Sequence, residues 1–165
     1  MSGFKPNKSK QEESIPRPIG KIKKFDQKLS DIFDSPARIR IKEVLGDAVI
    51  DNPDPKGADM IITHPGTRFK YLELQVCASW MTPKFPFDKL YVFSRKLRYG
   101  PDVLFLTMDR LLRRGYLFNF DKKDLKHLRK RRLKKWSREW VYELPWWMCI
   151  ECTIDDLDID TLELL

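Results

Sequence analysis

The sequence predicts an α/β fold in which helices flank a central mixed β-sheet. Short apolar runs of strand length occur at residues 57–62, 69–76 and 103–107, and turn-forming residues bound them. Segments with a helical spacing of apolar residues lie before and between these runs. The run 103–107 is apolar throughout, which is typical of a central strand that is covered on both faces. Helices that alternate with strands in this way pack on the faces of a sheet.

Composition limits the class of protein. The 165 residues, of which 42% are hydrophobic and 12% aromatic, suit one folded domain. A formal net charge of +8 and a pI near 9.4 favour a polyanionic partner, either nucleic acid or an acidic membrane surface. No apolar run approaches the roughly 18 residues of a membrane span, and no apolar signal segment opens the chain. With three cysteines, a disulfide framework is not expected.

These observations lead to an expected location. We expect an intracellular protein of the cytoplasm, nucleus or nucleoid that is neither secreted nor bound to a membrane.

The chain divides into three regions by composition. Residues 1–20 combine charged residues and prolines with almost nothing to bury, so we expect a disordered basic arm. Residues 21–150 carry the strand and helix patterns and are expected to form the domain. Residues 151–165 contain acidic residues and no basic ones, and are expected to form an acidic C-terminal tail.

Two helices and a strand are predicted at the start of the domain. The spacing of apolar residues over 21–33 predicts a short amphipathic helix. A capping serine, a proline and a stop glycine bracket a second helix at 37–45. Residues 48–50 then predict the first strand.

The second half of the chain predicts a crossover and a basic helix. Apolar residues at 87–99 have a helical period and predict a crossover helix that precedes the central strand at 103–107. Residues 116–120 predict an edge strand. Residues 121–140 predict a helix that is crowded with Lys and Arg, although the run 140–142 also suits a strand.

Two neighbouring predicted strands each carry one acidic residue inside an apolar run. An acid in such a place must be paired, hydrogen-bonded or bound to a cation. Because side chains alternate along a strand, Glu73 and Gln75 share a face with Tyr71, while Asp59 lies on the face of Ile61. A divalent metal site is the sharpest explanation of this pattern. A polar sheet face that contacts solvent is the alternative.

This order of helix, strand, strand with Asp, strand with Glu-x-Gln, helix and strand resembles the PD-(D/E)XK nuclease superfamily over roughly residues 36–107. Its members include restriction endonucleases, Holliday junction resolvases and nucleases of DNA repair and recombination. The resemblance implies a restriction-endonuclease-like core in which Asp59 and Glu73 are catalytic and hold Mg²⁺ or Mn²⁺. It also implies that the main-chain carbonyl of Leu74 is a third ligand.

Two further candidate catalytic residues come from the resemblance. Glu43 matches the acid that some members add from the first helix, and a solvent-facing charge is its alternative reading. Gln75 stands where most members have Lys. A neutral amide provides no positive charge, although it can orient a water molecule by hydrogen bonding. A lysine elsewhere, such as Lys70, Lys84 or Lys89, would then supply that charge.

The basic segment is expected to bind nucleic acid, with DNA favoured over RNA, because phosphate neutralisation is the usual role of such charge density. A nuclear-targeting patch would look the same. A homodimer would suit a cutter of junctions or double strands. The candidate nucleic-acid-binding residues are Lys122, Lys123, Lys126, Arg129, Lys130, Arg131, Arg132, Lys134, Lys135 and Arg138.

The expected function is that of a metal-dependent DNA endonuclease or exonuclease, structure-specific in DNA repair or recombination. Two alternatives stay open. One is a catalytically degenerate nuclease-fold module that binds nucleic acid without cutting it. The other is a basic structural or packaging protein, in which Asp59 and Glu73 are dispensable.

Overall fold

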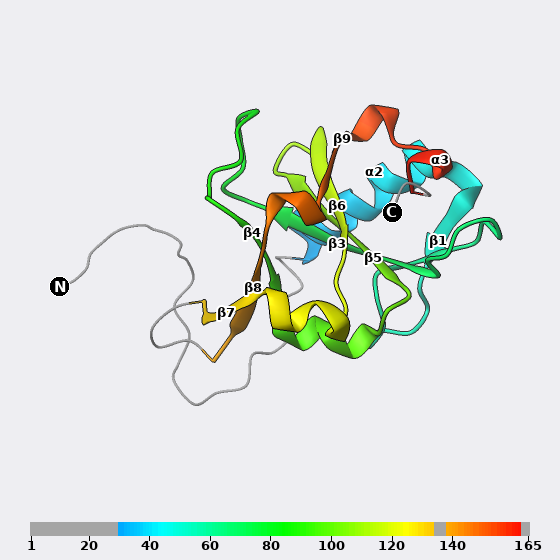
Figure 1. Ribbon diagram of the computed structural model, residues 1–165. Coiled ribbons are helices and arrows are strands. Elements are labelled where there is room, and N and C mark those ends of the chain that lie inside the picture. Colours follow the sequence, from blue (N-terminus) through cyan, green and yellow to red (C-terminus); the bar gives the residue numbers. More distant parts are fainter. Residues whose placement is uncertain (1–29, 134–137, 163–165) are drawn as a thin grey trace.

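Two β-sheets dominate the computed structural model, which describes residues 30–133 and 138–162 (Figure 1). The strands are β1 (Val49–Asp51), β2 (Met60–Ile62), β3 (Tyr71–Cys77), β4 (Leu90–Phe93), β5 (Val103–Asp109), β6 (Arg114–Asn119), β7 (Arg129–Arg132), β8 (Trp140–Leu144) and β9 (Ile150–Thr153). One sheet has six strands in the order β1-β2-β3-β5-β6-β9, and the other has three in the order β4-β8-β7. The larger sheet is mixed, because β3 and β5 are parallel and its other neighbours are antiparallel. The predicted α/β fold with a mixed sheet is confirmed.

The helices of the described chain are few and short. They are η1 (Ser30–Asp34), α2 (Ser35–Leu45), η2 (Gly46–Ala48), η3 (Ser94–Tyr99), η4 (Lys122–His127), η5 (Trp146–Met148), η6 (Ile154–Asp156) and α3 (Ile159–Leu162). Helix α2 matches the helix predicted at 37–45 and ends at Gly46, whose φ of +56° favours glycine. Among the described residues, no helix combines the length and apolar content that crossing a membrane requires.

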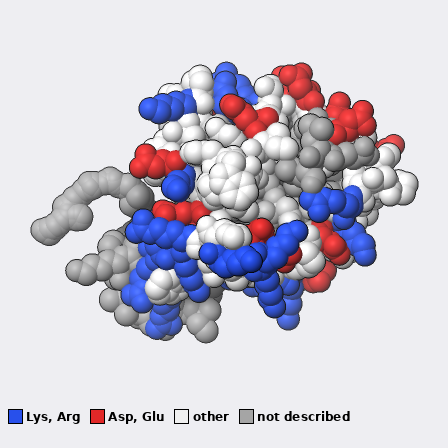
Figure 2. Space-filling view, in the orientation of Figure 1, with Lys and Arg blue, Asp and Glu red and all other residues white. Residues whose placement is uncertain are grey.

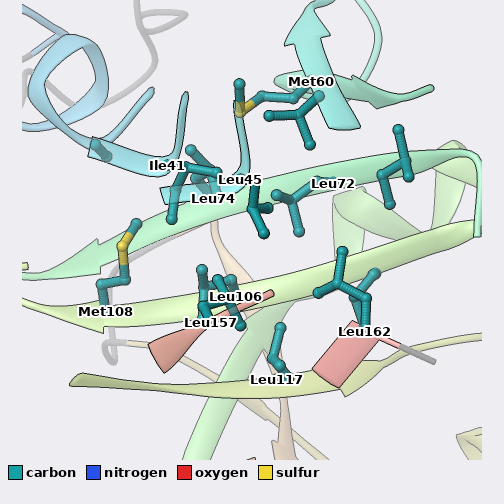
Figure 3. Packing of buried hydrophobic residues seen from close by; sticks show 14 of the residues in the cluster. Ile41, Leu45, Met60, Leu72, Leu74, Leu106, Met108, Leu117, Leu157 and Leu162 are labelled. Carbon is teal, nitrogen blue, oxygen red and sulfur yellow. The ribbon is translucent and has the colours of Figure 1, made fainter. Parts of the chain in front are cut away.

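One face of the six-stranded sheet is covered by α2 and by the C-terminal segment. Ile41 and Leu45 of α2 pack against Leu72 of β3 and Leu106 of β5, and Leu157 joins the same cluster (Figure 3). These side chains are buried. Burial of a stripe of α2 against alternate residues of β3 and β5 therefore holds the sheet on this side.

The opposite face is covered by the three-stranded sheet. Phe105 of β5 and Phe118 of β6 stack with their ring centroids 5.2 Å apart. Val92 of β4 and Leu144 of β8 belong to the same buried cluster. All seven residues of β5 are buried, as expected for a central strand with both faces covered.

The crossover helix predicted at 87–99 is wrong. The segment forms β4 and then the 3₁₀ helix η3. Leu90 and Val92 are buried while Tyr91 and Phe93 are only partly buried, so the burial alternates with the period of a strand. Pairing with β8 uses the β-branched and aromatic residues of this segment better than a helix would.

The basic helix predicted at 121–140 is also wrong. Its first part is the 3₁₀ helix η4, and its later part contains the antiparallel strands β7 and β8. Arg129 and Arg131 both form ion pairs with Glu143 of β8, and Arg131 Nε lies 2.7 Å from its carboxylate. In a helix, residues two apart point to different sides, whereas in β7 the two arginines share a face and reach the same carboxylate across the strand pair.

The ends of the domain also differ from the prediction. Strand β6 is not an edge, because β9 pairs with it, and residues 151–153 of the predicted acidic tail therefore belong to the sheet. Arg40 of α2 forms an ion pair with Asp155, which follows β9. The predicted arm at 1–20 and most of the helix predicted at 21–33 lie outside the described residues.

Candidate functional site

Asp59 and Glu73 are neighbours where β2 meets β3. The strand ladder ends at the pair Met60 and Leu72, and side chains make the next contacts. The Asp59 N–H donates to Glu73 Oε1 at 3.2 Å, and the Leu74 N–H donates to Asp59 Oδ2 at 2.8 Å. Two reciprocal hydrogen bonds therefore take the place of backbone pairing. The structure brings together the two carboxylates that the alternation along the strands predicts to converge.

Glu73 is buried and paired with a lysine. It is 6% exposed, and Lys96 of η3, which is 7% exposed, donates from Nζ to Glu73 Oε2 at 2.6 Å. A buried carboxylate is tolerated when it is paired and hydrogen-bonded in this way. The crossover element between β3 and β5 thus carries the counter-charge for the acid on β3.

The pKa of Asp59 is raised to near neutral pH. Burial and then the negative charge of Glu73 raise the pKa of Asp59 from its ordinary 3.8 to about 7. The hydrogen bond from Leu74 and the charges of Lys96 and Arg38 act in the opposite direction, with Arg38 Nη1 3.9 Å from Asp59 Oδ1. A cation placed beside Asp59 would relieve its repulsion with Glu73 and favour the ionised form.

The oxygen atoms of Asp59, Glu73 and the Leu74 carbonyl suit a magnesium ion that keeps most of its water ligands. The N–H and C=O of one strand residue point to the same edge, so the Leu74 carbonyl points to the side on which its N–H meets Asp59. Within residues 30–133 and 138–162, no three or more His, Cys, Asp or Glu side chains form a metal-binding group. Mg²⁺ commonly binds through one or two carboxylates together with water and substrate phosphate, so Asp59 and Glu73 meet that requirement.

Gln75 lies on the same face of β3 as Glu73 but points between the two sheets. Its Nε2 donates to Thr107 Oγ1 at 2.6 Å and to the Tyr91 carbonyl at 3.3 Å. It lines a cavity of about 70 Å³ together with Phe85 and other residues of β3 and β4. These bonds tie Gln75 to β5 and β4, and they do not bring it to Asp59.

Glu43 does not join the carboxylate pair. Its side chain is exposed on α2 and lies 3.6 Å from Arg40, which also contacts Asp155. Glu43 is therefore a solvent-facing charge, which was the alternative interpretation of this residue.

The basic residues spread over two elements instead of one helix. Lys122, Lys123 and Lys126 are exposed on η4. On β7, Lys130 Nζ lies 5.5 Å from the ring centroids of Trp140 and Tyr142, on the side opposite the ion pairs with Glu143. Of the remaining candidates, Arg129 and Arg131 form the ion pairs with Glu143, the guanidinium of Arg132 lies over the Trp140 ring, and Arg138 is exposed between β7 and β8. Lys134 and Lys135 lie outside the described residues.

Lys96 is the site residue that the sequence analysis missed. Of the lysines considered as a source of positive charge, Lys70 lies beside Asp102 on the surface, and Lys84 and Lys89 are exposed. A signal for Lys96 does exist in the sequence. An acid in a buried strand requires a cation, and the crossover that covers that strand carries Lys96 between two arginines.

The chain matches no family model, no curated protein and no solved structure. The functional argument therefore rests on the structure and the sequence of this chain.

The raised pKa of Asp59 predicts a pH-dependent cost of folding. Asp59 ionises at a lower pH in the unfolded chain, so the free energy of unfolding falls as the pH rises from about 4 to about 8. Asp59→Asn removes this ionisation and keeps an acceptor for the Leu74 N–H. We expect the variant to match the wild type at pH ~4 and to be more stable by up to about 4 kcal/mol at pH ~8, because each pH unit between the two pKa values contributes about 1.4 kcal/mol. Urea unfolding across this range measures the difference, and a pH-independent difference would contradict it.

The buried ion pair predicts a strong dependence of stability on Lys96. Lys96→Met leaves Glu73 buried without its counter-charge, and we expect a loss of about 3–5 kcal/mol in urea unfolding. Adding Glu73→Gln should recover part of this loss, because the unpaired charge is then gone. Lys42→Met is the matched control. Its partner Asp51 lies 2.8 Å away, close to the 2.6 Å of the buried pair, but is exposed, so the expected loss is below about 1 kcal/mol.

Proposed function

We propose that the protein is a metal-dependent nuclease that hydrolyses phosphodiester bonds in DNA, with Asp59 and Glu73 as ligands for Mg²⁺ or Mn²⁺. The observation that carries the proposal is the convergence of two carboxylates and one buried ammonium group. They come from three separate elements, β2, β3 and η3, and meet at one point of the sheet.

Each side chain has a distinct role in this proposal. A bound divalent ion would offset phosphate charge and activate water for attack. With a pKa of about 7, Asp59 is partly ionised at neutral pH and fully ionised above it, and its ionised form provides the hard oxygen ligand that such an ion prefers. Lys96 holds Glu73 in one orientation, and its ammonium group supplies positive charge for an oxygen that becomes more negative during hydrolysis.

Further support comes from the order of the elements. Helix α2, strands β1 and β2, strand β3 with its Glu-x-Gln, the crossover through η3, and strand β5 follow the order on which the resemblance to the PD-(D/E)XK superfamily rests. Lys96 reaches the face of β3 on which that superfamily has its motif lysine and Gln75 stands here. The departure at Gln75 therefore does not leave the site without a lysine.

A polyanionic substrate agrees with the surface. Lys and Arg side chains form a dense band across the lower part of the face in Figure 2, and some Asp and Glu side chains lie beside them. The exposed lysines of η4 and β7 include Lys122, Lys126 and Lys130. Such a density of positive charge favours a phosphate backbone as the partner.

A binding module without catalysis is the second candidate, and a specific observation favours it. Asp59 and Glu73 face Arg38 and Lys96, so two negative and two positive charges balance within one cluster. A cluster that is already neutral needs no metal ion. In that case the basic residues of η4 and β7 would bind nucleic acid, and the two carboxylates would only attach β2 to β3.

Cleavage separates the two candidates. We expect the wild type to cut DNA with Mg²⁺ or Mn²⁺ and not with chelator, on a labelled panel of duplex, single-stranded, flapped and four-way junction substrates. Asp59→Asn and Glu73→Gln should each lower the cleavage rate at least about 100-fold, since each removes a metal ligand. Binding should persist in both variants, because the anionic site does not attract phosphate by itself.

Glu43→Gln is the matched control for these variants. It removes a carboxylate of the same domain that is exposed and remote from the pair, so cleavage should stay within about twofold of the wild type. Binding with no cutting under any metal would transfer the proposal to the binding module. Equal cutting by Asp59→Asn and the wild type would remove these residues from the mechanism.

The basic surface predicts salt-dependent binding. We expect the logarithm of the affinity for duplex DNA to fall linearly with the logarithm of the salt concentration, because bound cations are released. Lys130→Gln should lower the steepness of this line by about 1, the value for one lost phosphate contact. Lys56→Gln, which changes an exposed lysine between β1 and β2, should leave it unchanged. Fluorescence anisotropy titrations at several salt concentrations measure both, and salt-insensitive binding would argue for a protein partner instead.

A further inference from the structure

Three large aromatic side chains are exposed on the loop before β4 and on η5. Phe87 lies in the loop before β4, and Trp146 and Trp147 lie in η5, between β8 and β9 (Figure 1). They are 46%, 39% and 77% exposed. We refer to Phe87, Trp146 and Trp147 as the aromatic surface. Large exposed rings that cluster in this way mark an interaction site more often than isolated ones do.

The aromatic surface is held in place from beneath. Trp146 donates from Nε1 to the Asp88 carbonyl at 2.8 Å, which ties η5 to the loop before β4. The Trp146 ring centroid lies 4.9 Å from that of Tyr116 and 5.5 Å from that of Phe85. Phe87 packs edge-on against Phe85 at 5.8 Å. Phe87 and Trp146 therefore form a preorganised platform, which lowers the cost of ordering them when a ligand binds. Trp147, the most exposed of the three rings, directly follows Trp146 in η5.

The platform continues toward the proposed catalytic centre. Phe85, which supports both Phe87 and Trp146, also lines the cavity that contains Gln75. Gln75 lies on the same face of β3 as Glu73. Strand β3 extends about 13 Å from Glu73 to its end at Cys77, at roughly 3.3 Å per residue, and Cys77 lines the cavity together with Phe85. A few nucleotides of extended chain span such a distance.

The charge around the platform suits a nucleic acid. The loop carries exposed Lys84 and Lys89 against the single carboxylate of Asp88. Uncharged side chains fill the middle of the face in Figure 2, and a band of Lys and Arg lies below them. Aromatic rings next to positive charge are the usual platform for unpaired bases, which stack on the rings while lysines meet the phosphates.

We propose that the aromatic surface binds an unpaired strand of nucleic acid by base stacking. The inference rests on the proposed function and gives its substrate class, a nucleic acid with a single-stranded segment next to the bond that is cut. Duplex bases are stacked on one another and present no free face, so the platform discriminates for unpaired strands.

The test is binding in the presence of chelator, which prevents cleavage. Fluorescence anisotropy compares a labelled 15-nucleotide single strand of DNA, the same strand as RNA, and the duplex. We expect Trp147→Ala to lower affinity for single strands about fivefold or more and affinity for the duplex less than twofold. Trp147→Phe should retain most of the affinity, since it keeps a ring. Ile39→Ala is the matched control, because Ile39 is 57% exposed on α2, and should change nothing.

Each outcome decides the proposal. A loss confined to single strands and rescued by Trp147→Phe supports it, and the DNA and RNA arms show which strand is preferred. Unchanged binding by Trp147→Ala, or equal loss on duplex and single strand, overturns it. Self-association that disappears in Trp147→Ala while binding of single strands persists assigns the surface to a second copy and also overturns it. Because no cutting occurs in this assay, a failure of the nuclease proposal appears separately, in the cleavage experiment.

Discussion

The arrangement of this domain depends on neutralising one buried carboxylate. Glu73 lies inside the central sheet, and an unpaired charge there would cost several kcal/mol. Lys96 meets that need, but only if the crossover brings η3 over β3. Because η3 directly follows β4, and β4 pairs with β8, the position of η3 also constrains the position of the smaller sheet. The acid on β3 thus constrains a segment more than twenty residues further along the chain.

The second consequence concerns how β2 is attached. Its ladder with β3 is short, and the hydrogen bonds from the backbone of Asp59 and Leu74 to the two carboxylates extend the attachment beyond it. The same oxygens that suit a cation therefore also hold the sheet together. Removing a carboxylate has a structural and a chemical effect at once, which is why isosteric amides separate the two effects better than alanine does.

Strand alternation was enough to predict that Glu73 and Gln75 share a face, because this depends only on the backbone period. That Asp59 lies beside Glu73 depends also on the antiparallel pairing of β2 with β3. The helix predicted at 87–99 failed because tertiary pairing with β8 overrode a weak helical period. The basic helix failed for a related reason, since Glu143 lies on a strand that the charge pattern alone does not reveal. Lys96 was missed because its partner is distant in the sequence, and only the crossing of η3 over β3 brings the two together.

Adjacent residues of η3 face different neighbours. Lys96 reaches Glu73 in the larger sheet, while Arg95 Nε lies 3.5 Å from Glu139, which directly precedes β8 in the smaller one. The charged cluster therefore spans both sheets and is not a property of the β2–β3 hairpin. Grafted onto another scaffold, that hairpin would bring two carboxylates without their counter-charge. A graft of this site therefore has to include η3 and the smaller sheet together with β2 and β3.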